Sequence, residues 1–244
     1  MLKRIDPKLL RKSVIKYAVS GSFVKRIPEE GTGADVLSRL EKIGIKDGYK
    51  VEKTKVEGTF SYPSYWAVAR LSQIGFVTGG GTPDTNVAAY WVNGTFEWIT
   101  PADMGAIRDF YLLPAKRKVT QLGIDNSSAK LLKTGSIVMS SRAPIGYIGI
   151  NRIPTATSQG CKSLTLFDDS LVDARFVLLA IKAALPDIID AASTMTFKEI
   201  SGTKFGEVII PIPPYEEQKR IVEKFLKIEP LLSEYEDLRE RERE

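Results

Sequence analysis

The alternation of apolar and polar residues divides the chain into a helical start, a strand-rich centre and a helical end. Asp6-Pro7 is an N-cap followed by a proline at the first helical position, and Gly21 is the residue expected to end that helix. Between them, one helical face carries the apolar residues Leu10, Val14, Tyr17 and Ala18. Residues 34–43 repeat this spacing and predict a second helix. The lysine-rich residues 46–57 that follow predict a loop.

Short runs rich in β-branched and aromatic residues, separated by glycine, proline and asparagine, make up the centre of the chain. They cover residues 66–71, 96–100, 136–140, 145–150 and 162–167. Helical spacing returns over residues 173–184 and again over residues 186–192. This order of elements predicts an α+β fold, in which a globular domain has a β-sheet core and flanking helices.

A long helix is predicted at the carboxyl end. The prolines up to Pro214 exclude a helix before Tyr215, and Pro230 is expected to kink or restart it. Apolar residues spaced four, three, four and three apart form a coiled-coil seam of Ile221, Phe225, Ile228, Leu232 and Tyr235. We expect this seam to need a partner helix, although a helix lying on its own domain shows the same pattern. The predicted parts are a helical segment (1–45), a globular domain (46–213) and this helix (214–244).

The composition leaves few kinds of catalysis open. The chain has no histidine and one cysteine, Cys161, so histidine-based catalysis and cysteine–histidine metal sites are excluded. The carboxylates of the central part are scattered rather than grouped for metal binding or acid–base chemistry: Asp103, Asp109, Asp125, Asp168 and Asp169. We therefore expect no catalytic residue and no metal site, and we expect Cys161 to be a buried apolar side chain.

The charge distribution favours a polyanionic partner. The net charge is +5, and residues 215–244 carry ten acidic against seven basic residues, so the basic excess belongs to residues 1–214. No stretch approaches the roughly 18 apolar residues that a membrane span needs, and the charged start does not predict a signal peptide. A cytoplasmic protein with no membrane partner is the expectation.

Two segments and several scattered side chains are candidates for binding such a partner. The glycines of Gly79-Gly80-Gly81-Thr82 would let backbone N–H groups approach a phosphate closely. Basic side chains would bind DNA phosphates, and nearby hydroxyl and amide groups would bind base edges. The candidate DNA-binding residues are Gly80, Gly81, Thr82, Lys116, Arg117, Lys118, Ser140, Ser141, Arg142, Gln159 and Lys162. Trp91 and Trp98 are expected in the core rather than as stacking platforms.

Several segments, in this order, resemble the specificity subunits of type I restriction-modification systems. They are Gly79-Gly80-Gly81-Thr82-Pro83-Asp84, Tyr90-Trp91, residues 98–103, residues 119–124, residues 135–146, Ser158-Gln159 and, most clearly, residues 210–222, with the sequence IPIPPYEEQKRIV. Residues 9–23 resemble the end of the family's central helical region. Members of the family typically carry two recognition domains and two helical regions, so this chain resembles a half-subunit.

The resemblance implies a division of labour among subunits. The recognition domain would read one half of a split double-stranded DNA site, and the helix would join a coiled coil that docks the methyltransferase subunits. S-adenosylmethionine, ATP and Mg²⁺ would belong to the methyltransferase and the restriction (motor) subunits, so this chain would bind no cofactor. A half-subunit would pair as a homodimer through the seam from Ile221 to Tyr235.

Two other functions fit parts of the sequence. One is a nucleotide-binding α/β enzyme that uses the Gly79–Gly81 loop for phosphate. The other is an interaction module whose domain has lost DNA binding. The feature expected to distinguish them is whether the basic residues and the glycine loop converge on one concave face.

Overall fold

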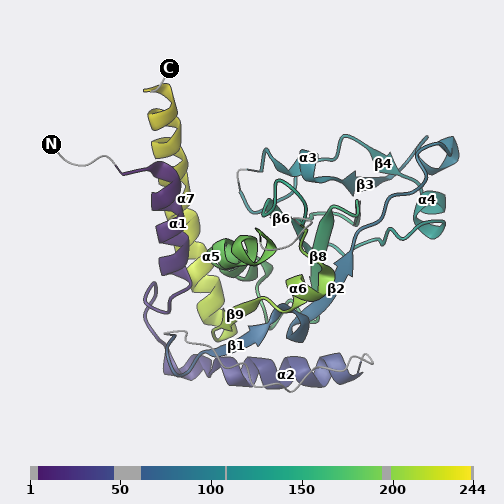
Figure 1. Cartoon of the computed structure of the whole chain (residues 1–244). Coiled ribbons are helices and arrows are strands. Elements are labelled where there is room, and N and C mark those ends of the chain that lie inside the picture. Colours follow the sequence, from purple (N-terminus) through teal and green to yellow (C-terminus); the bar gives the residue numbers. More distant parts are fainter. Residues whose placement is uncertain (1–4, 47–61, 108, 194–198, 243–244) are drawn as a thin grey trace.

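The computed structural model describes residues 5–46, 62–107, 109–193 and 199–242. It confirms the predicted α+β fold: a strand-rich body lies beside a short helix from the amino-terminal part of the chain that is paired with a long helix from the carboxyl-terminal part (Figure 1). The predicted loop lies, from residue 47 onward, outside the described residues. Within the described residues, no helix is both long and apolar enough to cross a membrane.

Both predicted amino-terminal helices are present. Helix α1 (Pro7–Ala18) begins as expected, because the Asp6 side chain accepts a hydrogen bond of 2.9 Å from the Leu9 N–H. Its predicted face is rotated, however: Ile15 and Ala18 are buried, whereas Tyr17 is exposed.

Helix α2 (Gly33–Lys46) begins in close contact with the strands. A Cβ at Gly33 would lie 1.9 Å from the carbonyl oxygen of Ile212, so only glycine fits where the helix begins.

The strands form three small sheets. β1 (Ala67–Arg70) and β9 (Ile209–Ile212) form an antiparallel pair, which brings the two ends of the body together. The second sheet has the order β2-β8-β5-β6, with β2 (Gly75–Gly79), β8 (Cys161–Leu166), β5 (Ile137–Ser140) and β6 (Ile148–Ile150). The third has the order β4-β3-β7, with β4 (Lys118–Val119), β3 (Phe96–Ile99) and β7 (Thr155–Thr157). β4 therefore lies at an edge.

Short helical turns lie between the longer elements. The α-helical turns are α3 (Pro101–Met104), α4 (Gln121–Asp125) and α6 (Gly202–Gly206), and the 3₁₀ turns are η1 (Pro28–Glu30), η2 (Leu71–Gln73) and η3 (Ala88–Tyr90). The five predicted strands are present as β1, β3, β5, β6 and β8. β2, β4, β7 and β9 were not predicted, because three of them are short or glycine-rich and β9 contains Pro211.

Two long helices run through internal prolines. α5 (Ala174–Ser193) joins the two predicted helical stretches across Pro186, and α7 (Tyr215–Arg241) continues across Pro230. The helix therefore does not restart at Pro230, and the alternative, a kink there, stays a prediction. Proline costs one backbone hydrogen bond, but apolar residues on both sides of Pro230, namely Phe225 and Leu232, are buried and hold the helix in place.

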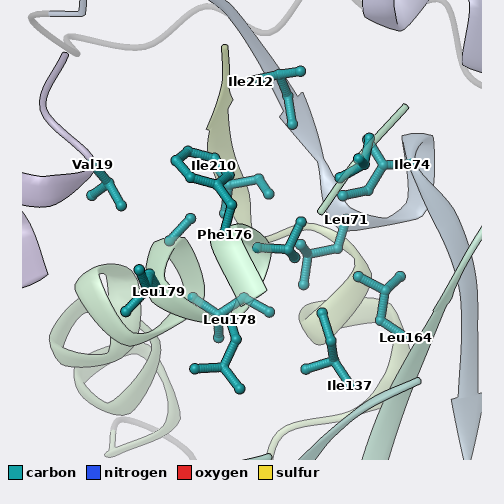
Figure 2. Close-up of a cluster of buried hydrophobic side chains, with 14 of the residues drawn as sticks. Val19, Leu71, Ile74, Ile137, Leu164, Phe176, Leu178, Leu179, Ile210 and Ile212 are labelled. Carbon is teal, nitrogen blue, oxygen red and sulfur yellow. The ribbon is translucent and has the colours of Figure 1, made fainter. Parts of the chain in front are cut away.

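The main core lies where α5 meets the sheets (Figure 2). Phe176, Leu178 and Leu179 of α5 pack with Ile210 and Ile212 of β9 and with side chains of the second sheet. The same cluster includes residues of all three predicted parts of the chain, from Ile15 in α1 to Phe225 in α7. The ends of the chain are therefore packed on the body, and the division at residues 45 and 213 stays a prediction.

The seam of α7 is covered by the chain itself. Ile221, Phe225 and Leu232 are buried, and Ile228 and Tyr235 are half-buried, against α1, α5 and the body. The expectation that these five residues need a second copy is wrong, because α1 is the partner helix.

Polar contacts fasten α1 to α7. Arg11 pairs with Glu229 at 2.7 Å and with Glu236 at 2.9 Å, and the Tyr235 hydroxyl donates to the carbonyl oxygen of Ile5 at 2.9 Å. Because residues near the start of α1 contact residues near the end of α7, the two helices are antiparallel (Figure 1).

Replacing Phe225 by alanine tests this intramolecular packing. The ring is 3% exposed and packs edge-on against Phe110 at 6.0 Å, so the substitution is expected to lower the free energy of unfolding by about 3–5 kcal/mol. Leu226→Ala, at a side chain that is 41% exposed, should change it by less than about 0.5 kcal/mol. Urea unfolding measures both. Equal effects of the two substitutions would contradict the packing.

Candidate nucleic-acid interface

The glycine segment after β2 does not present its N–H groups to solvent. The Gly80 N–H donates to the carbonyl oxygen of Cys161 at 3.3 Å, and the Gly81 N–H donates to that of Thr157 at 2.9 Å. These donors are used within the fold, so the prediction that Gly80 and Gly81 hold a phosphate is wrong. Thr82, the next candidate, is exposed.

Close packing explains the glycines. A Cβ at Gly80 would lie 1.9 Å from the carbonyl oxygen of Ser158, and one at Gly81 would lie 2.1 Å from the backbone nitrogen of Ala129. Neither position has room for a side chain. The glycines therefore let this segment pack closely against the backbone at Ser158 and at Ala129, rather than forming a nucleotide site.

A carboxylate from outside the predicted set organises several candidate residues. Glu199 pairs with the Arg142 Nε at 2.9 Å and with the Lys162 Nζ at 3.2 Å. Lys162 also donates to the Ser141 hydroxyl at 3.1 Å and to the carbonyl oxygen of Gln159 at 3.3 Å. The structure thus brings Ser141, Arg142, Gln159 and Lys162 together around Glu199, a carboxylate of the protein itself.

This network changes the roles of its members. Lys162 is only 8% exposed and has its donors in use, and Ser141 is fully buried, so the prediction that they contact DNA is wrong. Ser140 is buried too, because its hydroxyl donates to the carbonyl oxygen of Pro144 and accepts from the Tyr147 N–H.

Two members of the predicted set keep an exposed side chain here. Gln159 is exposed at the surface, and Arg142 is half-exposed with its charge balanced by Glu199.

The pKa of Glu199 reflects this arrangement. Burial opposes ionisation, but hydrogen bonds and charges from Arg142 and Lys162 outweigh it, and the pKa is lowered from the ordinary 4.5. The ionised carboxylate is thus the form that the folded protein stabilises.

The basic segment lies apart from this network, on the third sheet. Residues 116–118 lead into and form the edge strand β4, and all three side chains are exposed. Lys118 pairs with the buried Glu97 at 3.2 Å. The Lys116 side chain has no ion-pair partner among the described residues. The basic candidates are thus divided between this edge of the third sheet and the Glu199 network.

Two tryptophans support the basic segment. The Arg117 guanidinium lies 3.8 Å from the ring centre of Trp91 and 5.6 Å from that of Trp98. Trp98 is buried, as predicted, whereas the half-buried Trp91 also serves as a platform. Nothing in the sequence indicated that Trp98 lies beside Arg117. That contact depends on the pairing of two sheet segments, which was not predicted.

Other chemistry finds no support in the described residues. Cys161 is buried, as expected, and burial raises the pKa of its thiol to about 12. The described residues contain no group of three or more acidic, cysteine or histidine side chains placed to hold a metal ion.

Replacing Glu199 by glutamine is expected to lower the free energy of unfolding at pH 7 by about 1–3 kcal/mol, because the buried Lys162 loses its anion. A lowered carboxyl pKa contributes stability that is present above the ordinary value of 4.5 and is lost as the pH falls through the folded pKa. The difference between the two proteins should therefore shrink below about pH 4.5.

Glu207→Gln, at an exposed pair with Lys204, is the matched control and should cost less than about 0.5 kcal/mol. Urea unfolding across this pH range measures both variants. A difference that persists unchanged at pH 3 would contradict the role of the ionised carboxylate.

Comparison with known proteins agrees with the fold. Residues 63–236 match the model of the type I restriction modification DNA specificity domain. The specificity subunit of the type I restriction enzyme MjaIX of Methanocaldococcus jannaschii is 34% identical over 159 residues, which is 65% of this chain and 37% of that protein. The EcoR124I/EcoR124II specificity subunit of Escherichia coli is 30% identical over 159 residues, 63% of this chain and 38% of that protein.

A solved structure shows the same fold. The HsdS subunit from Thermoanaerobacter tengcongensis superposes with a TM-score of 0.54 at 19% identity, covering 93% of this chain and 47% of that one. The chain thus spans less than half the length of these relatives. Both of these curated relatives are specificity subunits of type I restriction enzymes, which agrees with the non-catalytic role that the sequence predicted. Since the matched domain covers well over half of its residues, the chain belongs to the family of type I restriction-modification specificity subunits.

Proposed function

We propose that this chain recognises a short segment of double-stranded DNA as the specificity component of a type I restriction-modification complex, and that it reads one half of a split target. The observation that carries the proposal is the exposed basic segment Lys116–Lys118 within the matched domain. Exposed cations of this kind bind phosphates, and the edge strand β4, which begins at Lys118, holds this segment at the surface.

The proposal includes partners and the absence of cofactors in this chain. Methyltransferase subunits would dock on it, and the restriction subunit would join through the complex. S-adenosylmethionine, ATP and Mg²⁺ would be bound by those subunits. Because the target is cellular DNA, a cytoplasmic location is part of the same proposal.

The α1–α7 pair supports a role in docking a partner, but through a surface other than the predicted seam from Ile221 to Tyr235. Its seam is buried, but Leu231 and Leu238, one heptad apart on α7, are 64% and 50% exposed, and Leu9 of α1 is 59% exposed. Exposed leucines on paired helices favour further helix packing. We propose that a methyltransferase subunit or a second copy of this chain packs on the face of α7 that carries Leu231 and Leu238.

The nucleotide-binding enzyme is not favoured, because the Gly80 and Gly81 N–H groups are already bonded within the fold. An interaction module without DNA binding remains the alternative. It has the same exposed leucines but predicts no salt-dependent binding to duplex DNA.

Replacing Lys116 by alanine is expected to weaken duplex binding about equally for all sequences. The slope of log affinity against log salt concentration should fall by about 0.9, which is the loss of one phosphate contact. Titration of a fluorescent duplex across a salt series measures the slope. Lys227→Ala, an exposed lysine on α7, is the control and should leave the slope unchanged. Identical slopes for the wild type and Lys116→Ala would exclude this contact.

Pairing through the exposed leucines predicts a dimer of the 27.1 kDa chain at micromolar concentration. Leu231→Glu combined with Leu238→Glu should give a monomer, because charges would be buried without partners. Leu113→Glu, at an exposed leucine of the body, should leave the dimer intact. Light scattering measures the mass. A wild-type monomer at every concentration would disprove homodimer formation and leave docking to the methyltransferase subunit as the use of this face.

A further inference from the structure

Arg117 is held in a fixed orientation by two tryptophans. Its guanidinium stacks on Trp91, and the rings of Trp91 and Trp98 meet edge-on at 5.0 Å. Each indole is itself fixed by a hydrogen bond: the Trp91 Nε1 donates to the carbonyl oxygen of Asp84 and the Trp98 Nε1 to that of Gly81, both at 3.0 Å. The glycine-rich segment therefore positions the aromatic pair that holds Arg117.

The backbone on either side of Arg117 is fixed as well. The carbonyl oxygen of Arg117 accepts from the Trp98 N–H at 3.1 Å. The N–H of Lys116 donates to an Asp103 carboxyl oxygen, and that of Ala115 donates to the buried Glu97. The segment just before β4 thus presents the Arg117 side chain from a rigid base, which a residue that reads bases needs.

The three basic residues of this segment differ in whether their charge and their N–H groups are free to bind a ligand. Lys118 has its charge balanced by Glu97. Lys116 is a flexible point charge without an ion-pair partner among the described residues. Arg117 has no acidic partner among the described residues either: its guanidinium carbon lies 3.8 Å from the Trp91 ring centre, and no side-chain hydrogen bond to the described residues takes up its N–H groups.

We propose that Arg117 determines specificity by donating two parallel hydrogen bonds to the O6 and N7 of a guanine in the major groove. The inference rests on the proposed function and names one base of the target. A planar fork held in one orientation matches the paired acceptors of guanine. A phosphate is the other acceptor of the same chemistry, but its recognition does not require a fixed fork, and Lys116 lies beside Arg117 to bind it.

The test starts from duplexes selected at random. The wild-type chain, assembled with its methyltransferase subunits, is used to enrich a motif from randomised DNA, and the preference at each base pair is then measured. At one guanine position the wild type should discriminate by about 5-fold to more than 100-fold, the range that one bidentate contact supplies. Replacing that guanine by 7-deazaguanine, which lacks N7, should weaken wild-type binding without altering the protein.

Arg117→Lys is the decisive variant, because it keeps the positive charge and removes the planar guanidinium that can donate two parallel hydrogen bonds. It should lose the preference at that one position and keep the salt dependence of binding. Trp91→Ala should lose the same preference, whereas Trp91→Phe, which keeps a ring under the guanidinium, should retain most of it. The Lys116→Ala variant should keep the full motif.

The outcomes separate this inference from the proposed function. A wild-type motif that contains no guanine, or one that survives Arg117→Lys and 7-deazaguanine unchanged, would overturn the role of Arg117 and leave DNA recognition standing. Failure of the wild-type complex to enrich any motif would disprove DNA recognition itself. If Arg117→Lys lowers affinity equally for every sequence, the residue binds phosphate and the inference is wrong.

Discussion

The whole arrangement depends on the buried side chain of Gln218 in the first turn of α7. Its Oε1 accepts from the Asp173 N–H at 2.9 Å, and its Nε2 donates to the carbonyl oxygens of Pro213 and, at 3.5 Å, Leu171. One amide thus joins the start of α5, the end of β9 and the start of α7. Because these donors and acceptors are buried together, any other placement of α7 would leave them unpaired.

The neighbouring Glu217 links the start of α7 to the segment just before β1. Its carboxylate is buried and accepts from the Tyr65 hydroxyl at 3.1 Å, just before β1, which pairs with β9. The prolines around this point keep the chain extended until α7 begins. With α7 fixed at its base, α1 packs along it, and the strand-rich body projects to one side (Figure 1).

The sequence predicted long and regular elements well. Helices with strong periodicity or clear caps, such as the one capped by Asp6, were predicted within a few residues, and so were the β-branched runs. Two- and three-residue strands carry too little pattern to be recognised, and periodicity alone does not say whether an apolar seam faces its own chain. The partner of the α7 seam is α1, more than 200 residues away in sequence, and only the tertiary fold brings them together.

The candidate site was predicted by residue type but not by burial. Lys162 and Ser141 were predicted to contact a ligand. Instead, Lys162 donates a hydrogen bond to Glu199, which lies 37 residues away in the sequence. The glycines suggested an anion site because glycine permits close approach, and the structure shows that they approach the protein's own backbone. Lys116–Lys118 were predicted correctly as exposed cations, since solvation of charge needs no tertiary information.

The way the segment before β4 is attached has a consequence for how such a protein diverges. Main-chain groups at Ala115, Lys116 and Arg117 hold this segment, and their bonds go to Glu97, Asp103 and the backbone of Trp98. Main-chain bonds do not depend on which side chain a residue carries. Successive generations can therefore exchange the side chains of Lys116 and Arg117 at little cost to folding, whereas Lys118 also balances the buried Glu97, so this surface can acquire new preferences while the framework beneath it is inherited unchanged.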